Sequence, residues 1–210
     1  MTVDKRTAMR RFRRLMRSGN KAIQTRYQKA TAVKVVESTQ EQFERLIPEI
    51  PYIGGKKNPA TDLLITSAAI IALYRVLKKQ GVSVEEFGKI LKEITTDYIY
   101  RYPAWVRNLM GWIWMNRFLR RFMHKRALIS QQRSYNEDFV YEVVLENGQY
   151  EWGIDYLECG IFKFLQKQGE TQLAEYMCEL DYVMFPALGV RLKRTETIAQ
   201  GYKRCNFRFK

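Results

Sequence analysis

Histidine, cysteine and proline are scarce in this sequence, and their scarcity restricts the chemistry that the side chains can supply. The 210 residues include one histidine, three cysteines and five prolines. Because His124 is the only histidine, we discount a Ser-His-Asp triad. Three cysteines in the last quarter of the chain are a poor disulfide framework and favour a reducing compartment. We therefore expect a cytoplasmic protein.

Long apolar runs are also missing. The longest, residues 63–73, contains two hydroxyl residues and is much shorter than the ~20 residues that a membrane-spanning helix needs. A second run, residues 109–115, is shorter and lies between Arg107 and Arg117. The first thirty residues are basic and lack the apolar core of a signal peptide. We expect no transmembrane segment.

Positive charge is abundant and uneven. The formal net charge is +14, and residues 1–30 contain ten Lys or Arg against the single acid Asp4. Residues 101–136 contain eight Lys or Arg and no acid. The simplest interpretation is a solvated basic surface. The alternatives are that segments 1–30 and 101–126 contact an anionic membrane surface or a nucleic acid, or that the charge attracts an acidic substrate.

The first half of the chain has helical periodicity. We expect a helix from residue 5 that is interrupted at Gly19-Asn20, and a central helix at residues 63–77 that is apolar on nearly all sides. Apolar residues recur every three or four positions from Pro103 to Lys125. This pattern predicts a mainly helical region over residues 1–126.

The pattern changes to β-strands in residues 127–210, the cysteine-containing region. Asn147-Gly148 is a strong hairpin signal between two strand-like segments. Two helices, 161–168 and 171–184, then precede two final strands, 190–198 and 204–209. We predict an α+β fold in which N-terminal helices are followed by an antiparallel sheet of about four strands with two inserted helices. Both regions are expected to form one compact unit, with a seam near residues 127–136.

Three side chains are candidates for catalysis. Cys159 stands between a predicted strand and a predicted helix, where the helix amides favour a thiolate and lower its pKa. Cys178 and Asp181 are three residues apart on a predicted helix and share a face, so the carboxylate can serve as a general base or share a metal with the thiol. The alternatives are structural: Cys159 as a small buried side chain, and Asp181 as a partner of backbone groups near Pro186.

Cys205 has a different expected role. It alternates with Phe207 and Phe209 on the last predicted strand, which favours packing in the core. The three cysteines together also suggest a zinc-like metal site, with Asp181 or His124 as the fourth ligand. Their gaps of 19 and 27 residues are unlike paired CxxC motifs, so the fold would have to assemble such a site.

A glycine loop precedes the central helix. Gly54, Gly55 and the following Lys56 can hold an anionic group such as a carboxylate at the helix N-terminus. The loop matches neither a P-loop nor a dinucleotide-binding fingerprint. An ordinary turn is the alternative.

Aromatic residues are concentrated next to the second basic segment. Trp105, Trp112 and Trp114 can lie on a membrane surface, stack on bases or line a pocket for a planar ligand. Core packing is the simpler interpretation.

Several short motifs occur in order along the chain. They are Pro51-Tyr52-Ile53-Gly54-Gly55-Lys56, Glu158-Cys159, Cys178-x-x-Asp181, Arg194-Thr195-x-Thr197-Ile198 and Gly201-x-x-x-Cys205-x-Phe207. In combination they resemble the L-2-amino-thiazoline-4-carboxylic acid hydrolase family. The last motif is also similar, more loosely, to the end of 4-vinyl-reductase domains, which are small-ligand-binding modules.

The resemblance implies a hydrolase that adds water to the C=N carbon of a small carboxylated heterocycle and opens its ring. It implies that Cys159 or Cys178 attacks the substrate or binds a metal, that Asp181 handles the proton, and that Arg194 or Lys56 holds the carboxylate. Two alternatives without this activity stay open. One is a ligand- or metal-binding sensor, and the other is a peripheral protein on anionic membrane or nucleic acid.

Overall fold

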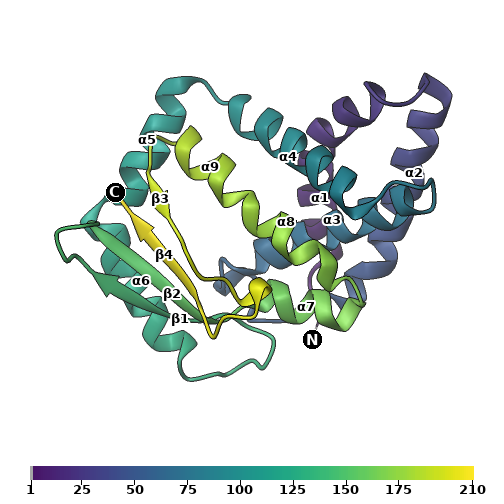
Figure 1. Ribbon diagram of the computed structural model, residues 1–210. Coiled ribbons are helices and arrows are strands. Elements are labelled where there is room, and N and C mark those ends of the chain that lie inside the picture. Colours follow the sequence, from purple (N-terminus) through teal and green to yellow (C-terminus); the bar gives the residue numbers. More distant parts are fainter. Residues whose placement is uncertain (1) are drawn as a thin grey trace.

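The structure, a computed structural model, describes residues 2–210 and places a series of helices before a four-stranded sheet (Figure 1). The helices are α1 (Lys5–Gln24), α2 (Lys29–Leu46), α3 (Thr61–Lys78), α4 (Val84–Tyr100), α5 (Ala104–Met115), α6 (Arg117–Ser130), α7 (Gly160–Gln168), α8 (Ala174–Glu179) and α9 (Asp181–Ala187). Short 3-10 turns are η1 (Ile47–Glu49), η2 (Gly55–Lys57), η3 (Thr171–Leu173) and η4 (Ile198–Gln200). The strands are β1 (Val140–Leu145), β2 (Trp152–Glu158), β3 (Leu192–Lys193) and β4 (Cys205–Phe209). The predicted α+β class is confirmed.

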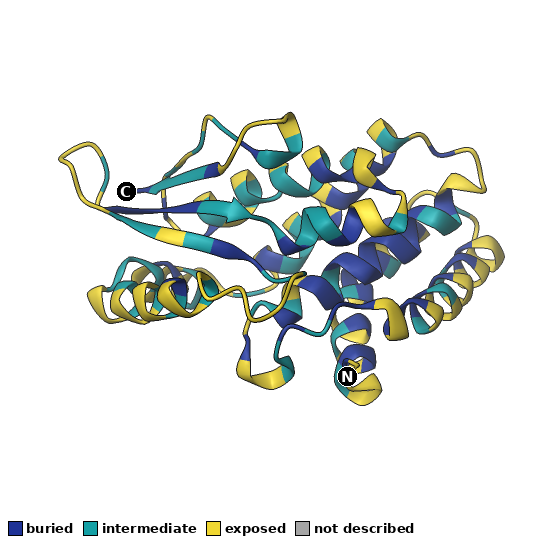
Figure 2. Cartoon of the chain, turned by 90° about the horizontal axis from the view of Figure 1, so that it is seen from below, coloured by how far each residue is buried: buried dark blue, intermediate teal, exposed yellow. Residues whose placement is uncertain are grey.

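Helix α3 is the centre of the helical part. Its side chains are buried on nearly all sides, as predicted, and α1, α2 and α4 pack around it. The Phe12 ring of α1 stacks on the Phe43 ring of α2 with centroids 4.6 Å apart. Buried residues, dark blue in Figure 2, follow this helix and continue into the inner strands. The apolar composition of α3 is therefore explained by burial among other helices.

The predicted interruption of the first helix at Gly19 is wrong. Helix α1 continues through Gly19 to Gln24 and ends at the turn before α2. A β-carbon on Gly19 would lie 3.1 Å from the sulfur of Met16 and 4.0 Å from Ile94 of α4. The tight contact is with Met16 of the same helix, whereas 4.0 Å to Ile94 is an ordinary contact. Gly19 is buried in α1, which packs against α4, and burial outweighs the low helix propensity of glycine.

The sheet has the strand order β1-β2-β4-β3 and every neighbouring pair is antiparallel. The predicted hairpin at Asn147-Gly148 joins β1 to β2. Strand β3 has only two residues, although a strand over 190–198 was predicted. Beyond residue 193 the amides of Thr195 and Glu196 both donate to the side chain of Asn206, and the Glu196 carbonyl accepts from the Asn206 backbone amide, so the regular ladder ends there. The insertion between β2 and β3 contains three helices and not two, since the second predicted helix breaks at Leu180.

One face of the sheet packs against α5, α6 and α9. Trp114 of α5 and Phe185 of α9 meet Trp152 of β2 and Phe209 of β4, with ring centroids 4.9 to 5.5 Å apart. Each of the two buried clusters contains residues from before and after segment 127–136. The boundary that we predicted there between a helical and a cysteine-containing region therefore stays a prediction. No helix within residues 2–210 combines the length and apolarity needed to cross a bilayer.

The contact between α5 and α9 depends on Gly111. A β-carbon at this position would lie 1.9 Å from the carbonyl oxygen of Leu188, which is backbone and cannot rotate away. We predict that Gly111→Ala lowers the free energy of unfolding by about 1–3 kcal/mol because the helix must move outward. Urea unfolding measures this change, and Met110→Ala on the exposed side of the same helix is the control. Equal midpoints for both variants would show that this close approach is not required.

Candidate functional site

Five polar side chains come together where the sheet meets helices α7 to α9. Cys159 stands between β2 and α7, Cys178 lies in α8, Asp181 begins α9, Arg194 follows β3 and Cys205 begins β4. Burial raises the pKa of each of the three thiols, and the charge of Asp181 raises it further. The three thiols therefore lie within electrostatic reach of one carboxylate.

Arg194 and Asp181 form the central ion pair. The Arg194 side chain is 3% exposed, its Nη1 donates to Asp181 Oδ2 at 2.6 Å and its Nη2 donates to the Cys178 carbonyl at 2.8 Å. The rings of Tyr182 and Phe207 lie 5.1 and 4.8 Å from the guanidinium carbon. With two nitrogens engaged and two rings close to its carbon, the guanidinium is positioned to orient Asp181.

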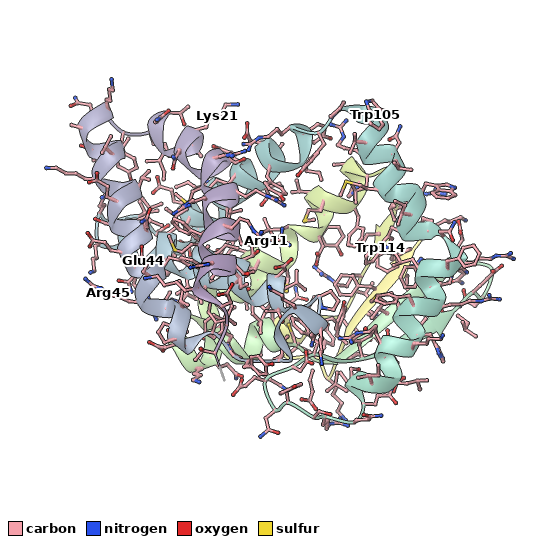
Figure 3. All side chains as sticks on the ribbon, turned by 180° about the vertical axis from the view of Figure 1, so that it is seen from behind. Arg11, Lys21, Glu44, Arg45, Trp105 and Trp114 are labelled. Atoms are coloured by element: carbon pink, nitrogen blue, oxygen red, sulfur yellow. The ribbon has the colours of Figure 1, made fainter. Side chains whose placement is uncertain are left out.

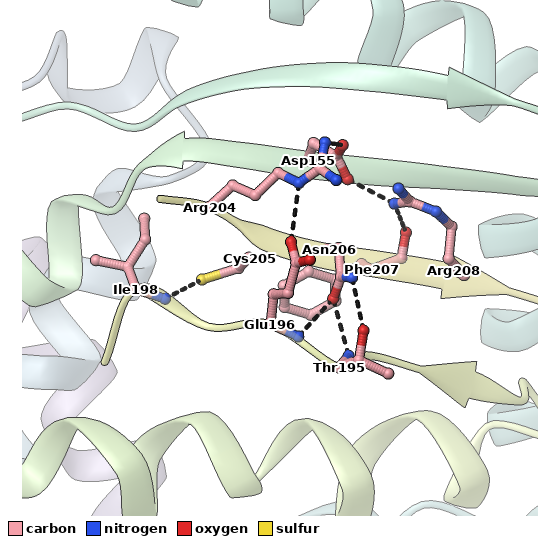
Figure 4. Close-up of polar contacts among 9 residues, drawn as sticks. All are labelled: Asp155, Thr195, Glu196, Ile198, Arg204, Cys205, Asn206, Phe207 and Arg208. Atoms are coloured by element: carbon pink, nitrogen blue, oxygen red, sulfur yellow. Dashed lines mark hydrogen bonds and ion pairs between the residues drawn. The ribbon is translucent and has the colours of Figure 1, made fainter. Parts of the chain in front are cut away.

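The segment after Arg194 is held on β4 by side-chain bonds (Figure 4). Asn206 Oδ1 accepts from the amides of Thr195 and Glu196, both at 2.8 Å, and its Nδ2 donates to Thr195 Oγ1 at 2.8 Å. The sulfur of Cys205 accepts from the Ile198 amide at 3.2 Å. Asn206 and Cys205 thus have bracing roles, and the predicted core position of Cys205 agrees with its burial.

Ion pairs on the opposite face of the sheet also hold the segment that follows Arg194. The Asp155 side chain is 7% exposed and accepts from Arg204 at 2.8 Å and from Arg208 at 2.5 Å. Arg204 also pairs with Glu196 at 3.0 Å, which links Asp155 to the segment carrying Arg194 (Figure 4). Because a buried carboxylate needs such partners, Asp155 belongs to the framework.

Tyr156 was not among the sequence candidates, yet it lies in the same cluster. It is directly opposite Cys205 in the pairing of β2 with β4, and its ring meets that of Phe207 with centroids 5.4 Å apart. Burial raises its pKa, and Asp181 and Cys159 raise it further, so the phenol stays protonated at neutral pH. The alternation Trp152, Ile154, Tyr156 places it on the inner face, but only the strand pairing brings it to Cys205.

Asp181 has the electrostatic properties of a proton acceptor at neutral pH. Desolvation raises its pKa from 3.8 to about 6, while the charge and hydrogen bond of Arg194 limit the increase. Its side chain is 31% exposed, so water can reach the carboxylate. A carboxyl group with a pKa close to neutral, accessible to water and held by a fixed cation, is suited to general acid–base catalysis.

The predicted thiolate at Cys159 is wrong. Cys159 does occupy the N-cap position of α7, and the amides of Phe162 and Ile161 favour its charged form. Burial has the larger effect and raises the pKa of Cys159 to about 11. Burial likewise raises the pKa of Cys178 to about 12, although Arg194 opposes the increase. Both thiols are therefore protonated at neutral pH.

A zinc-like site does not fit the side chains present. Within residues 2–210, no group of three or more His, Cys, Asp or Glu side chains is arranged to hold a metal ion. His124, the alternative ligand, is exposed on α6.

The glycine loop is a braced turn joined to a different segment. Gly54 and Gly55 adopt left-handed backbone angles, and the side-chain Nδ2 of Asn58 donates to the Ile53 carbonyl at 2.8 Å and to Asp138 Oδ2 at 2.7 Å. Lys56 is exposed. Within residues 2–210, no hydrogen bond or ion pair joins Gly54, Gly55 or Lys56 to the cysteine cluster, so their substrate-binding role stays a prediction.

The comparison with known families agrees with the motifs. The family described as L-2-amino-thiazoline-4-carboxylic acid hydrolase matches residues 63–209, and the chain belongs to this family. No curated protein and no solved structure matches the chain significantly. The matched range includes the whole cysteine cluster and Arg194, whereas the upstream element Pro51–Lys56 lies outside it.

The raised thiol pKa values predict slow alkylation. An increase from 9 to about 11 at Cys159 lowers its thiolate fraction at pH 8 by about 100-fold. Iodoacetamide should therefore label Cys159 and Cys178 much more slowly in the folded protein than after unfolding in urea, as measured by mass spectrometry. Labelling of either folded thiol at the rate of the unfolded chain would contradict the burial of these sulfurs.

Proposed function

We propose that the chain is a hydrolase that adds water to the C=N carbon of a small cyclic carboxylic acid of the thiazoline type, with Asp181 as the proton acceptor. The observation that carries the proposal is a water-accessible carboxylate with a pKa of about 6, held by an enclosed arginine. Membership of the family supports the substrate class. The neighbouring phenol and thiols supply neutral proton donors.

The reaction moves both protons of one water molecule, the first to the ring nitrogen and the second to the ring sulfur. Asp181 accepts the proton while the water oxygen forms a bond to the C=N carbon and the π electrons move to the ring nitrogen. The ring nitrogen then takes a proton from protonated Asp181, either directly or through Tyr156, whose phenol Asp181 reprotonates. The tetrahedral carbon then expels the ring sulfur, which leaves as a thiol once it takes up the proton released by the new hydroxyl. The product is an open-chain carbamoyl cysteine, equal in composition to the substrate plus water.

Cys178 and Cys159 have a secondary role in this scheme. Asp181 can also accept a proton from Cys178, whose thiolate would then attack the same carbon. Because the pKa of Cys178 is raised to about 12, it is a thiol at rest, and either nucleophile must give its proton to Asp181 as it attacks. The scheme takes water as the nucleophile because ring opening consumes water in any case. In this scheme both sulfurs are present as neutral thiols.

Arg194 is a positioning residue in this scheme. Its bonds to Asp181 and to the Cys178 carbonyl keep the carboxylate in one orientation. We propose that Lys56, which lies in the glycine loop, is the cation that binds the substrate carboxylate. Lys56→Gln then raises KM with little change in kcat, whereas Arg194→Met lowers kcat and shifts the pH profile.

We predict that Asp181→Asn lowers kcat/KM for 2-amino-thiazoline-4-carboxylate by about 10²–10⁴, because the amide cannot accept a proton. The control is Glu179→Gln, the same chemical change at an exposed residue two positions away. In the wild type, the rate should fall as the pH drops through about 6, where Asp181 becomes protonated. Ring opening is followed by loss of the substrate and appearance of a free thiol.

The alternatives have distinct outcomes. Binding of the thiazoline acid without turnover would favour a sensor over an enzyme. Full activity of Asp181→Asn would remove Asp181 from the mechanism, and loss of activity only in Cys178→Ser would favour attack by the thiolate. Circular dichroism and urea unfolding of each variant separate lost chemistry from lost folding.

A further inference from the structure

An unusual concentration of exposed apolar side chains lies on α5 and α6, two helices that take no part in the proposed reaction. Among the described residues 2–210, seventeen large hydrophobic residues are exposed, and nine of them fall within residues 104–130. They are Trp105, Leu109, Met110, Trp112, Ile113, Phe118, Phe122, Leu128 and Ile129. We call these nine residues the α5–α6 apolar surface. Apolar side chains gathered in this way mark a site of interaction.

The spacing shows that the apolar residues form the outer face of α5. Trp105, Leu109, Trp112 and Ile113 recur at intervals that place them on one side of a helix. Trp105 and Trp112 are 69% and 64% exposed. Figure 3 shows Trp105 at the outer end of α5 and Trp114 directed inward, toward the sheet. Core packing thus explains Trp114 alone, and the other two tryptophans need a partner.

Unpaired positive charge accompanies this surface on α6. Arg117, Arg121 and Lys125 are exposed, and none of them belongs to an ion pair within residues 2–210. Residues 104–130 contain six Lys or Arg and no Asp or Glu. Phe118, which is 66% exposed, lies under the Arg117 guanidinium at 5.6 Å. Tryptophan, phenylalanine and arginine side by side suit the boundary between lipid headgroups and acyl chains.

We propose that the α5–α6 surface docks this protein on an anionic lipid bilayer. The apolar side chains enter the interfacial region, and Arg117, Arg121 and Lys125 contact acidic headgroups. A recess of about 240 Å³ between α5 and the segment Leu188–Val190 opens beside Trp112 and continues the apolar surface. Because no helix within residues 2–210 is suited to span a bilayer, the docking is peripheral.

The charge and the apolar side chains of this surface argue against a second copy of the chain and against a nucleic acid as the partner. A second copy of the chain would bring two strongly basic, acid-free surfaces together, which costs free energy. A nucleic acid satisfies the positive charge, but phosphate contacts do not explain nine exposed apolar residues. An anionic bilayer matches both the charge and the apolar surface.

Helix α1 provides an internal comparison. It is also basic, but its apolar residues are buried and several of its cations are paired, as in Lys5–Glu44 at 2.9 Å and Lys21–Asp97 at 2.7 Å. Helices α1 and α2 lie on the other side of the molecule from α5 and α6 in both Figure 1 and Figure 3. If charge alone drove docking, α1 would serve as well as α6. The proposal therefore assigns the membrane contact to α5 and α6, whereas the basic segments predicted from sequence also included residues 1–30.

The test is cosedimentation of the full chain with phosphatidylcholine vesicles, with and without phosphatidylserine. The wild type should bind the mixed vesicles at low salt, bind pure phosphatidylcholine weakly and show a blue shift of tryptophan fluorescence on binding. Trp105→Ala/Trp112→Ala/Phe118→Ala should weaken binding by at least about tenfold. Arg117→Gln/Arg121→Gln/Lys125→Gln should weaken binding to the mixed vesicles by on the order of 100-fold.

The matched control is Arg6→Gln/Arg10→Gln/Arg17→Gln, which removes the same charge from exposed positions on α1. It should change vesicle binding by less than about threefold, since short-range contacts are made by α6. The proposal fails if the wild type does not bind vesicles that contain phosphatidylserine. It fails equally if the α6 and α1 charge variants lose the same amount of binding, or if the aromatic variant binds as well as the wild type. It also fails if the chain forms dimers through this face or binds duplex DNA more tightly than vesicles. Ring opening without vesicles should be unchanged in all three variants, so failure here leaves the proposed reaction untouched.

Discussion

A guanidinium that is almost completely enclosed is the constraint on which the candidate site depends. Removing Arg194 from water costs several kcal/mol unless partners replace the lost hydration. The partners come from three directions: the Asp181 carboxylate, the Cys178 carbonyl and the rings of Tyr182 and Phe207. The ion pair therefore fixes α8, α9 and β4 relative to one another.

The same interaction sets the chemistry of the carboxylate. Desolvation alone would make Asp181 a poor anion, and a fully enclosed ion pair would make it a poor base. The structure has an intermediate balance in which burial raises the pKa to about 6 and Arg194 limits the increase. Residues of the short motifs described above hold Arg194 in the position that sets this pKa. Thr195, Cys205 and the residue between Cys205 and Phe207, Asn206, hold the chain that presents Arg194.

Much of the fold could be predicted from local sequence patterns. The apolar helix α3, the Asn147-Gly148 hairpin and the inward face of β4 follow from periodicity and turn chemistry. The continuity of α1 through Gly19 could not be predicted, because the packing of α1 against α4 is a tertiary contact. The site divides in the same way. The shared face of Cys178 and Asp181 was predictable, but the pKa of Cys159 was not, since burial outweighs the amides of its helix. Tyr156 entered the site only through strand pairing, and the exposure of Trp105 and Trp112 required knowing which face of α5 the sheet covers.

The titration of the Asp181 carboxyl group tests the central claim most directly. Carbon-13 NMR of protein labelled at aspartate side-chain carboxyls, assigned by comparison with Asp181→Asn, follows this group from acidic to neutral pH. The account predicts a midpoint at about pH 6 in the wild type and a higher midpoint in Arg194→Met, which lacks the cation that favours the charged form. A midpoint near 4 that does not respond to Arg194→Met would contradict the account, because Asp181 would then be an ordinary solvated carboxylate.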